Sequence, residues 1–505
     1  MSTYPQEPAA VHHSSDASEL AEKNAVYATK TDESPALESG QEYDIQQTAA
    51  GSQRQLARSL KGRHMQMIAI GGAIGAGLFV GSGGALRSGG PAALVIGFII
   101  IGVMLLLTMQ ALAELAVLYP VNGAFYHITI AFWPTGAAIN VGVWITVFLV
   151  ALSFIQILGI RGYGEVEFVL SIIKIAACTG FILLGIIINC GGVSTDSRGY
   201  IGGQYWQTTG AFRNGFKGFC SVFVTGEAFS LKSPHLHISP ALTTVVSTAS
   251  FSFGGTELTG LAAAEAKDPL KSIPRATKQV FWRITFFYVI CLLIVGLIVP
   301  SDDPNLLHSS GANTQYSPFV IAINLAGIKA LPSVFNVVIC LSVISVANSS
   351  AFASTRTMQA LALQGMAPKF LAYVDKHGRP LWCIVVQLLF GLLAFVGEAS
   401  GGGGSAFFSW LLALSGLANF FIWGSICFSH IRFRAGWLAQ GHSLDDLPYR
   451  ATFGVIGSWV GLALNLVCLT ASFYSALYPV GGSPNARAFF ESYLAAPLIF
   501  ALYIG

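Results

Sequence analysis

Charged residues are scarce in this chain. Only 10% of its 505 residues are Asp, Glu, Lys or Arg, whereas soluble domains carry about 25%. The formal net charge is only +3 and is spread thinly along the sequence, so there is no basic patch of the kind that binds nucleic acid. The shortage of charge argues against an ordinary soluble protein and against a nucleic-acid partner.

The sequence also lacks the short patterns of common enzymes and metal sites. It contains no GxxxxGK[ST], HExxH or GxSxG pattern. Its eight cysteines form no CxxC pair and no Cys/His cluster, and most stand one to an apolar segment, as small buried side chains do. We therefore expect no enzymatic activity, no metal and no cofactor.

The N-terminal residues are polar and lack the apolar core of a secretory signal peptide. Residues 1–60 are rich in Ser, Gln, Ala, Glu and Asp, a composition typical of disorder. We expect a disordered cytosolic tail over 1–60 and a transmembrane domain over 61–505.

Long apolar stretches are what the sequence has instead. Hydrophobic residues make up 53% of the chain and gather in stretches of about 16 to 27 residues, close to the ~20 that a membrane-spanning helix needs. Backbone polar groups in lipid must be bonded internally, so repeated stretches predict a helical bundle. The expected fold is an all-α polytopic membrane protein with about eleven spans, near 67–86, 92–118, 139–159, 168–188, 219–264 (interrupted), 280–299, 333–353, 382–397, 405–428, 455–478 and 490–505. The last span ends without a polar flank, which predicts a truncated C-terminus.

Lys and Arg residues in the connecting segments predict the orientation, because cytosolic loops are enriched in them. Basic residues concentrate in 54–63, 267–283, 356–379 and 432–450, and are absent from 300–318 and 398–404. The basic segments and the N-terminus should therefore be cytosolic. Five spans separate the first two basic segments, and an odd number cannot join two points on one side. One crossing is thus missing, or one extra is hidden, between residues 87 and 266.

The first span carries four glycines between residues 71 and 77. Glycine costs a helix interior about 1 kcal/mol relative to alanine, so this span should be locally unwound. Freed N–H groups at the positive end of a half-helix would form a site for a carboxylate. Close helix packing through small residues explains the glycines equally well.

The interrupted span carries a second glycine pair, Gly254-Gly255, next to Glu257. An ionisable group inside a membrane is costly and indicates function, although Glu257 could instead brace the two helix halves by hydrogen bonds. Lys174 also lies within a span, either for function or with its amine reaching the cytosolic interface. Glu114 lies near the cytosolic end of the second span, where a cap or loop contact is favoured over a proton site. Asn348 and Ser415 could line a cavity or bond neighbouring helices.

Several segments in this order resemble the fungal amino-acid permeases of the amino acid–polyamine–organocation superfamily: GAIGAGLFVGSG, SGGPAALVIGF, LAELAVLYPVNGAF, RGYGEVEF, FSFGGTELTGLAAAE and DPLKSIPRA. The resemblance covers about residues 56–505. It implies two inverted five-helix repeats with broken first and sixth helices, twelve spans in all, and proton symport of L-amino acids through the plasma membrane.

The resemblance also implies roles for residues of both glycine segments. N–H groups around Ala73, Ile74, Gly75, Ala76 and Gly77 would hold the substrate carboxylate, and carbonyls around Phe253, Gly254, Gly255 and Thr256 would hold its ammonium group. Asn348 and Ser415 complete the expected substrate site, with Ser415 tuning side-chain preference. Lys174, Glu257 and Glu114 are the candidates for proton coupling, and Lys174 resembles the fifth-helix lysine of proton-coupled relatives.

The chain departs from the family pattern in two places. After Tyr126 it jumps to His127–Trp133, which resembles the far end of the third family helix, so one span is missing where the loop charges placed the fault. Residues 226–249 have no family counterpart. Both departures are expected to be gene-model or splicing artefacts, with a genuine isoform as the alternative. Besides transport, this leaves a non-transporting amino-acid sensor and a transport-dead chain as possible functions.

Overall fold

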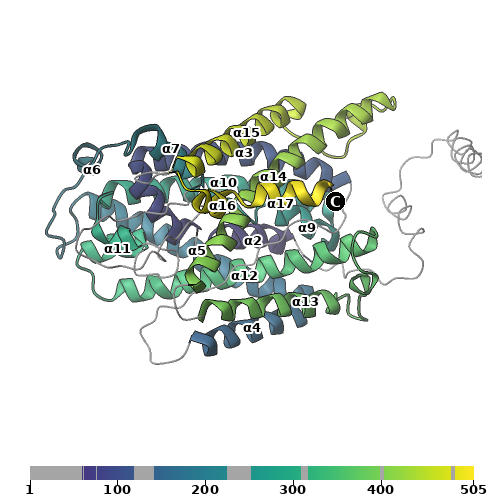
Figure 1. Ribbon diagram of the computed structural model, residues 1–505, viewed down its shortest axis with the longest axis horizontal. Helices are drawn as coiled ribbons and strands as arrows, with labels where there is room; N and C mark the ends of the chain where they lie inside the picture. Colours follow the sequence, from purple (N-terminus) through teal and green to yellow (C-terminus); the bar gives the residue numbers. More distant parts are fainter. Residues whose placement is uncertain are drawn as a thin grey trace, which may run out of the picture. The chain divides into compact units, whose positions relative to one another are not determined.

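A computed structural model describes residues 60, 62–75, 77–118, 141–224, 252–308, 317–398, 403–478 and 484–504. All of them belong to one compact unit, Arg54–Gly505. The expected tail over 1–60 lies outside the described residues except for Leu60, as do the Tyr126–His127 junction and the segment 226–249. The described residues form helices and one isolated parallel bridge, between Leu60 and Ala266 (Figure 1).

Described helices overlap each of the expected spans, and several of them extend beyond it. In chain order they are α2 (Gly62–Ala73), the π-helical turn η2 (Gly77–Gly81), α3 (Ser82–Leu118), α4 (Val141–Ile157), α5 (Gly159–Asn189), α6 (Gln204–Thr208), α7 (Gly215–Val224), α9 (Leu258–Leu261) with the 3₁₀ turn η3 (Ala262–Glu265), α10 (Pro269–Ile298), η4 (Pro304–His308), α11 (Pro318–Leu325), α12 (Leu331–Leu363), η6 (Lys369–Ala372), α13 (Leu381–Gly391), η7 (Leu392–Glu398), α14 (Gly403–Ala439), η8 (Leu444–Asp446), α15 (Gly454–Leu477), α16 (Ala486–Tyr493) and α17 (Ala495–Ile504).

The element α3 is two helices in succession. Gly90 has φ 84° and ψ 170°, outside the helical region, and Pro91 follows it. Proline suits the first turn of a helix, where its missing N–H is not needed. The break at Gly90 separates the first two expected spans, 67–86 and 92–118.

Membrane-spanning character is clear from length and composition. Five of the described stretches are long and apolar enough to cross a bilayer: Gly77–Val117, Gly159–Asn189, Leu331–Leu363, Leu414–Ala439 and Gly454–Leu477. Shorter apolar helices cover Thr146–Ile157, Thr285–Ile298 and Leu381–Phe395. The fold is therefore that of an all-α polytopic membrane protein, as the sequence predicts.

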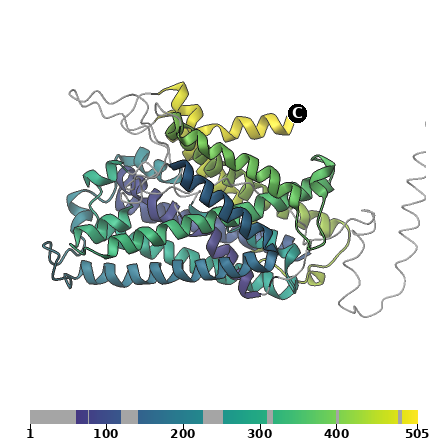
Figure 2. The ribbon, with the colours of Figure 1, turned by 90° about the horizontal axis from the view of Figure 1, so that it is seen from below.

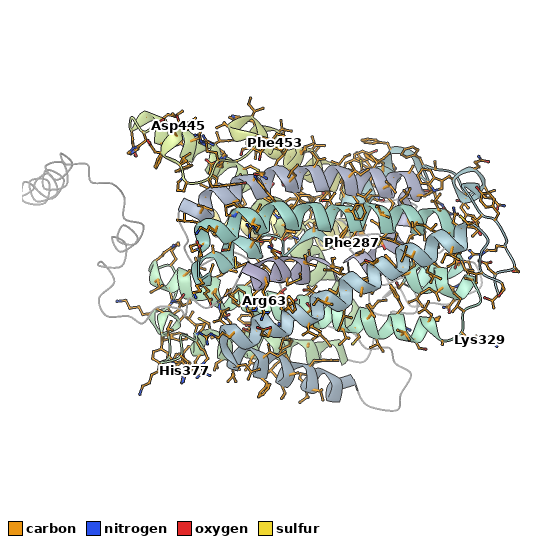
Figure 3. The ribbon with its side chains drawn as sticks, turned by 180° about the vertical axis from the view of Figure 1, so that it is seen from behind. Arg63, Phe287, Lys329, His377, Asp445 and Phe453 are labelled. Carbon is orange, nitrogen blue, oxygen red and sulfur yellow. The ribbon has the colours of Figure 1, made fainter. Side chains whose placement is uncertain are left out.

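The basic segments gather at one end of the helices. Leu60 pairs with Ala266, Arg356 contacts Glu265 at 2.8 Å, and Arg434 contacts Glu114 at 2.5 Å. In Figure 3, Lys329 and His377 lie toward opposite ends of α12, with His377 in the basic segment that follows this helix. The common side that the loop charges predict for these segments is thus observed.

The same end also fixes the direction of α3 and α4. Ala113 and Val117, in the last turns of α3, share a buried apolar cluster with Ile160 and Tyr163 in the first turn of α5. Since α4 ends at Ile157, directly before α5, both α3 and α4 run toward this end. The chain therefore leaves α3 at one end of the helices and enters α4 at the other.

Candidate functional site

The first glycine segment is broken as expected. The helix α2 ends at Ala73, Ile74 and Gly75 are not helical, and a π-helical turn begins at Gly77. Ala76 lies outside the described residues. Neither the Gly75 amide nor the Gly77 amide donates a hydrogen bond to any residue that the structure describes. Such free donors at a helix break are suited to an anionic group.

The second glycine segment is also broken. Ser252 and Phe253 are helical, residues 254–257 form a turn, and Gly255 has φ 94°. This left-handed conformation favours glycine because it has no β-carbon. The Gly255 amide donates to the Glu257 carboxylate at 3.0 Å, and the Thr256 hydroxyl donates to the Phe253 carbonyl at 3.2 Å.

The two breaks lie directly against each other. A β-carbon placed on Gly255 would lie 2.8 Å from the carbonyl carbon and oxygen of Gly72, and one on Gly77 would lie 2.5 Å from the Ser252 Cα. The Tyr288 hydroxyl on α10 lies 2.8 Å from the Ala73 carbonyl oxygen and 2.5 Å from that of Ser252, so it bridges both breaks. The glycines therefore allow two backbones to meet at the place where both helices are interrupted.

Close helix packing, which the sequence offered as an alternative explanation of the glycines, is also observed. Gly75 packs against Val346 of α12, since a β-carbon on Gly75 would lie 3.5 Å from the Val346 Cβ and closer still to its methyl carbon. Phe253, beside the second break, stacks on the Tyr288 ring with 4.6 Å between centroids. The same residues unwind the helices and let them approach.

Glu257 acts as a brace. It is buried and accepts the Gly255 amide two residues before it, and the indole N–H of Trp423 on α14 points to it at 3.5 Å. These contacts are those expected of a hydrogen-bond brace between the helix halves, and they tie α14 to the second break. Ser415 lies two turns before Trp423 on the same helix and is half-buried.

Asn348 lies in a polar cluster between α4, α5 and α12. Its side-chain N–H donates to Glu167 at 3.0 Å, and its carbonyl oxygen accepts from Gln156 at 3.2 Å. The Ser345 hydroxyl also donates to Glu167. Among the described residues, the hydrogen-bond partners of Asn348 are therefore in this cluster, and none of them belongs to the glycine breaks.

Lys174 belongs to a stripe of buried residues on one face of α5. Tyr163, Glu167, Ser171 and Lys174 recur at intervals of three or four residues, which is the spacing of a single helix face. The Ser171 hydroxyl donates to the Met67 carbonyl oxygen of α2 at 2.9 Å. Lys174 is almost fully buried, at 1% exposure, so its amine is inside the protein and does not reach the interface.

Glu114 is held by cations from α14. Its carboxylate lies 3.0 Å from the His430 Nε2 and 2.5 Å from the Arg434 Nε, and it accepts the Ala451 amide at 2.6 Å. This cluster fastens the end of α3 to α14 and to the segment that follows it. The loop contact favoured by the sequence is observed.

Several residues of these contacts were not singled out from the sequence, among them Tyr288, Trp423, Glu167 and Ser252. Tyr288 and Trp423 carry polar groups within apolar helices, which could have marked them. Glu167 is an intramembrane carboxylate and by that rule also a candidate. Ser252 gave no signal beyond its place beside the Gly-Gly pair.

Comparison with known proteins identifies the family. The family model described as amino acid permease matches residues 64–128 and 126–505. The chain belongs to this family. The two matched segments meet at residues 126–128, where the sequence pattern predicts a missing helix.

Individual relatives agree with this assignment. The chain is 50% identical over 484 residues to an uncharacterised amino-acid permease of Schizosaccharomyces pombe, covering 89% of this chain and 78% of the relative. It is 48% identical to cationic amino acid transporter 1 of the same yeast, with the same coverage, and 46% identical to the general amino-acid permease GAP1 of Saccharomyces cerevisiae, covering 90% of this chain and 77% of that one. Among solved structures, Mhp1, a nucleobase-cation symporter, matches with a TM-score of 0.42 and 14% identity over 88% of this chain and 99% of that one. Amino-acid transport is accordingly the function of this family, and the chain is a transporter, not an enzyme.

Proposed function

We propose that this chain moves L-amino acids across the plasma membrane together with protons, with its N-terminus in the cytosol. The observation that carries the proposal is the contact between the two broken helices. It brings the Gly75 and Gly77 amides, which donate to no residue that the structure describes, next to the turn of the other break. An amino acid has an anionic and a cationic group on one carbon atom, so a site for it needs donors and acceptors within a few ångströms.

The Gly75 and Gly77 amides are the proposed partners of the substrate carboxylate. Carbonyl oxygens of Phe253 to Gly255 are the proposed partners of the ammonium group, since helix carbonyls released by a turn carry partial negative charge. In this structure the Phe253 carbonyl accepts from the Thr256 hydroxyl. A substrate ammonium would compete with that hydroxyl, which gives Thr256 a place in the site.

Proton coupling is proposed to depend on Lys174. The free energy of burying an amine in a low-dielectric interior depends on whether the amine is charged. Gain or loss of a proton can therefore shift the balance between two conformations. Glu257 supports the same coupling through its brace at the second break, since loss of its charge would weaken the contacts with Gly255 and Trp423. Glu114 acts at the cytosolic end of α3, through its contact with Arg434.

Uptake by the purified chain in liposomes tests the proposal. A panel of labelled basic, neutral and acidic amino acids is appropriate, because the relatives include proteins named a cationic transporter and a general permease. Accumulation should require an inward proton gradient and should disappear when a protonophore collapses it. Accumulation that survives the protonophore would exclude proton symport.

A transport-dead chain is a second candidate, favoured by one observation. The family match is in two segments that meet at residues 126–128, and the third family helix has no counterpart there in the sequence. The same uptake assay should therefore include a version in which the corresponding segment of the 50% identical relative is inserted between Tyr126 and His127. Uptake restored only by the insertion would assign the chain to this class. Binding without uptake in both versions would favour a sensor.

A further inference from the structure

We propose that Glu167 is the carboxylate that takes up and releases the coupled proton, and that its protonation loosens α12 from α5. This inference rests on the proposed proton symport and deepens it. Glu167 is fully buried, at 0% exposure, and Figure 2 shows α5 and α12 as long helices running side by side.

The hydrogen bonds around Glu167 fit its ionised form. Asn348 Nδ2 donates to it at 3.0 Å, and the Ser345 hydroxyl is a second donor from α12. Gln156 of α4 donates to the carbonyl oxygen of Asn348 at 3.2 Å, which turns the amide nitrogen of Asn348 toward Glu167. Both donors are therefore directed at a carboxylate that only accepts.

A protonated Glu167 changes the same cluster. The neutral acid must donate its O–H, so the Ser345 hydroxyl has to turn from donor to acceptor to receive it. Hydrogen bonds to a neutral acid are also weaker than those to a carboxylate, by roughly half. Protonation thus weakens the attachment of α12 to α5 and leaves a donor to be satisfied by rearrangement.

The cation that faces Glu167 along α5 is Lys174, two turns further on the same buried face. Helical side chains point back toward the N-terminus, so the Lys174 amine reaches in the direction of Glu167. Ser171, between them, donates to Met67 of α2 shortly before the first break. Charge on Glu167 is therefore placed next to both the α12 contact and the broken helix.

The other ionisable groups near this part of α5 have partners of their own. Arg356 of α12 contacts Glu265 of η3 at 2.8 Å, and the Tyr163 hydroxyl donates to Ser349 at 3.4 Å. His64 of α2 contacts Glu165 at 3.1 Å. The group that α4 presents is Gln156, which does not titrate. Further along α5, Cys178 faces the Cys291 and Tyr288 side chains of α10.

Two other carboxylates, Glu114 and Glu165, differ from Glu167 because each is paired with an arginine. Glu114 contacts Arg434, and Glu165 contacts Arg63 at 2.5 Å with its side chain half exposed. An arginine stays charged and keeps its carboxylate ionised. Glu167 instead receives neutral donors and faces a lysine, whose charge can change.

The matched pair of variants is E167Q and E165Q, the same chemical change two residues apart. In liposomes with the full chain, E167Q should keep exchange of labelled for unlabelled amino acid and lose accumulation driven by a proton gradient. Exchange needs no net proton movement, so a merely structural defect would impair both. E165Q should keep both activities. Gradient-driven accumulation by E167Q with unchanged pH dependence would overturn the inference.

Infrared spectroscopy of the purified chain in lipid separates this inference from the proposed function. The carbonyl stretch of a buried carboxylic acid should appear as the pH is lowered, remain in E165Q and be missing in E167Q. If the unmodified chain neither accumulates nor exchanges amino acids, the proposed symport fails, but this band still decides whether Glu167 titrates. A band that persists in E167Q would show that another group holds the proton.

Discussion

Replacing Gly77 with alanine should force the two broken helices apart. A β-carbon on Gly77 would lie 2.5 Å from Cα and 2.8 Å from the backbone nitrogen of Ser252, whereas non-bonded carbon atoms are separated by about 3.5–4.0 Å. Because the clash is with backbone atoms, no side-chain rotation relieves it, and one segment has to move by about 1 Å. Overpacking of this kind costs about 1–3 kcal/mol, equivalent to a ~5–150-fold change in an equilibrium constant.

Gly84 provides the matched control, because no atom lies within 4 Å of a β-carbon placed there. Alanine at Gly84 should be neutral or stabilise the helix by up to about 1 kcal/mol. The assay is thermal unfolding of the purified chain in lipid nanodiscs, with binding of a labelled amino acid measured on the same samples. Gly77→Ala should unfold at a lower temperature and bind more weakly than Gly84→Ala. Equal unfolding and equal binding would refute the idea that the two breaks must touch.

Three further changes test other contacts. Gly75→Ala should clash with Val346, and the double variant Gly75→Ala/Val346→Ala should regain thermal stability without regaining substrate affinity; recovery of both would mean that Gly75 serves packing alone. Lys174→Ala should retain some substrate binding while uptake loses its pH dependence, and an unaltered pH dependence would make Lys174 structural. Burial raises the pKa of Asp375. Hydrogen bonds from the Arg379 side chain, at 2.7 Å, and from nearby amides lower this pKa by more than burial raises it, so the pKa lies below the usual 3.8. The stabilisation from Asp375 is therefore present above about pH 4 and is lost as the pH falls through the lower folded pKa. Asp375→Asn should cost about 1–3 kcal/mol at pH 7 and should reduce the loss of melting temperature in acid. An acid dependence equal to that of the unmodified chain would contradict the assignment.

The sequence predicts the spans and both helix breaks, for physical reasons that act locally. Lipid requires long apolar helices, and glycine weakens a helix wherever it stands, so neither prediction needs knowledge of neighbours. The limits of the helices are less predictable. Helix α10 begins at Pro269 and α14 ends at Ala439, well outside the expected spans 280–299 and 405–428. Hydropathy detects the part of a helix within lipid, whereas the helix continues through its charged ends.

The same effect explains why Glu167 was overlooked. Arg161 and Glu165 give the start of α5 a polar composition, and the expected span began at residue 168, whereas the helix begins at Gly159. Glu167 therefore fell just outside the expected span and was not considered as a carboxylate within a helix. Its partners on α12, Ser345 and Asn348, depend on which helices pair and at what level. Sequence periodicity indicates which face of a helix is buried, but it does not indicate which other helix packs against that face.

The last span shows a further limit. The stretch 490–505 was expected as one helix, and the structure has two short ones, α16 and α17, that meet at Leu494. Apolar composition alone cannot distinguish a continuous helix from a bent one. Similarly, the bridge of Tyr288 between Ala73 and Ser252 joins residues far apart in the sequence, and only the packing of α10 against both breaks creates it.

Three observations bear on the expectation that a crossing is missing between α3 and α4. The loop charges require an even number of spans where five are found, and α3 and α4 both run toward the end where Ala113 and Tyr163 pack together. The family model, in turn, matches in two segments that meet at residues 126–128. The end of α3 at Leu118 and the start of α4 at Val141 thus lie at opposite ends of the helices, which is what a missing third helix would leave. We expect the transcript to contain additional coding sequence at the Tyr126–His127 junction and to lack the segment 226–249. Sequencing it is the direct measurement, and a transcript that encodes the chain as it stands, with a product that alone transports amino acids, would contradict this expectation.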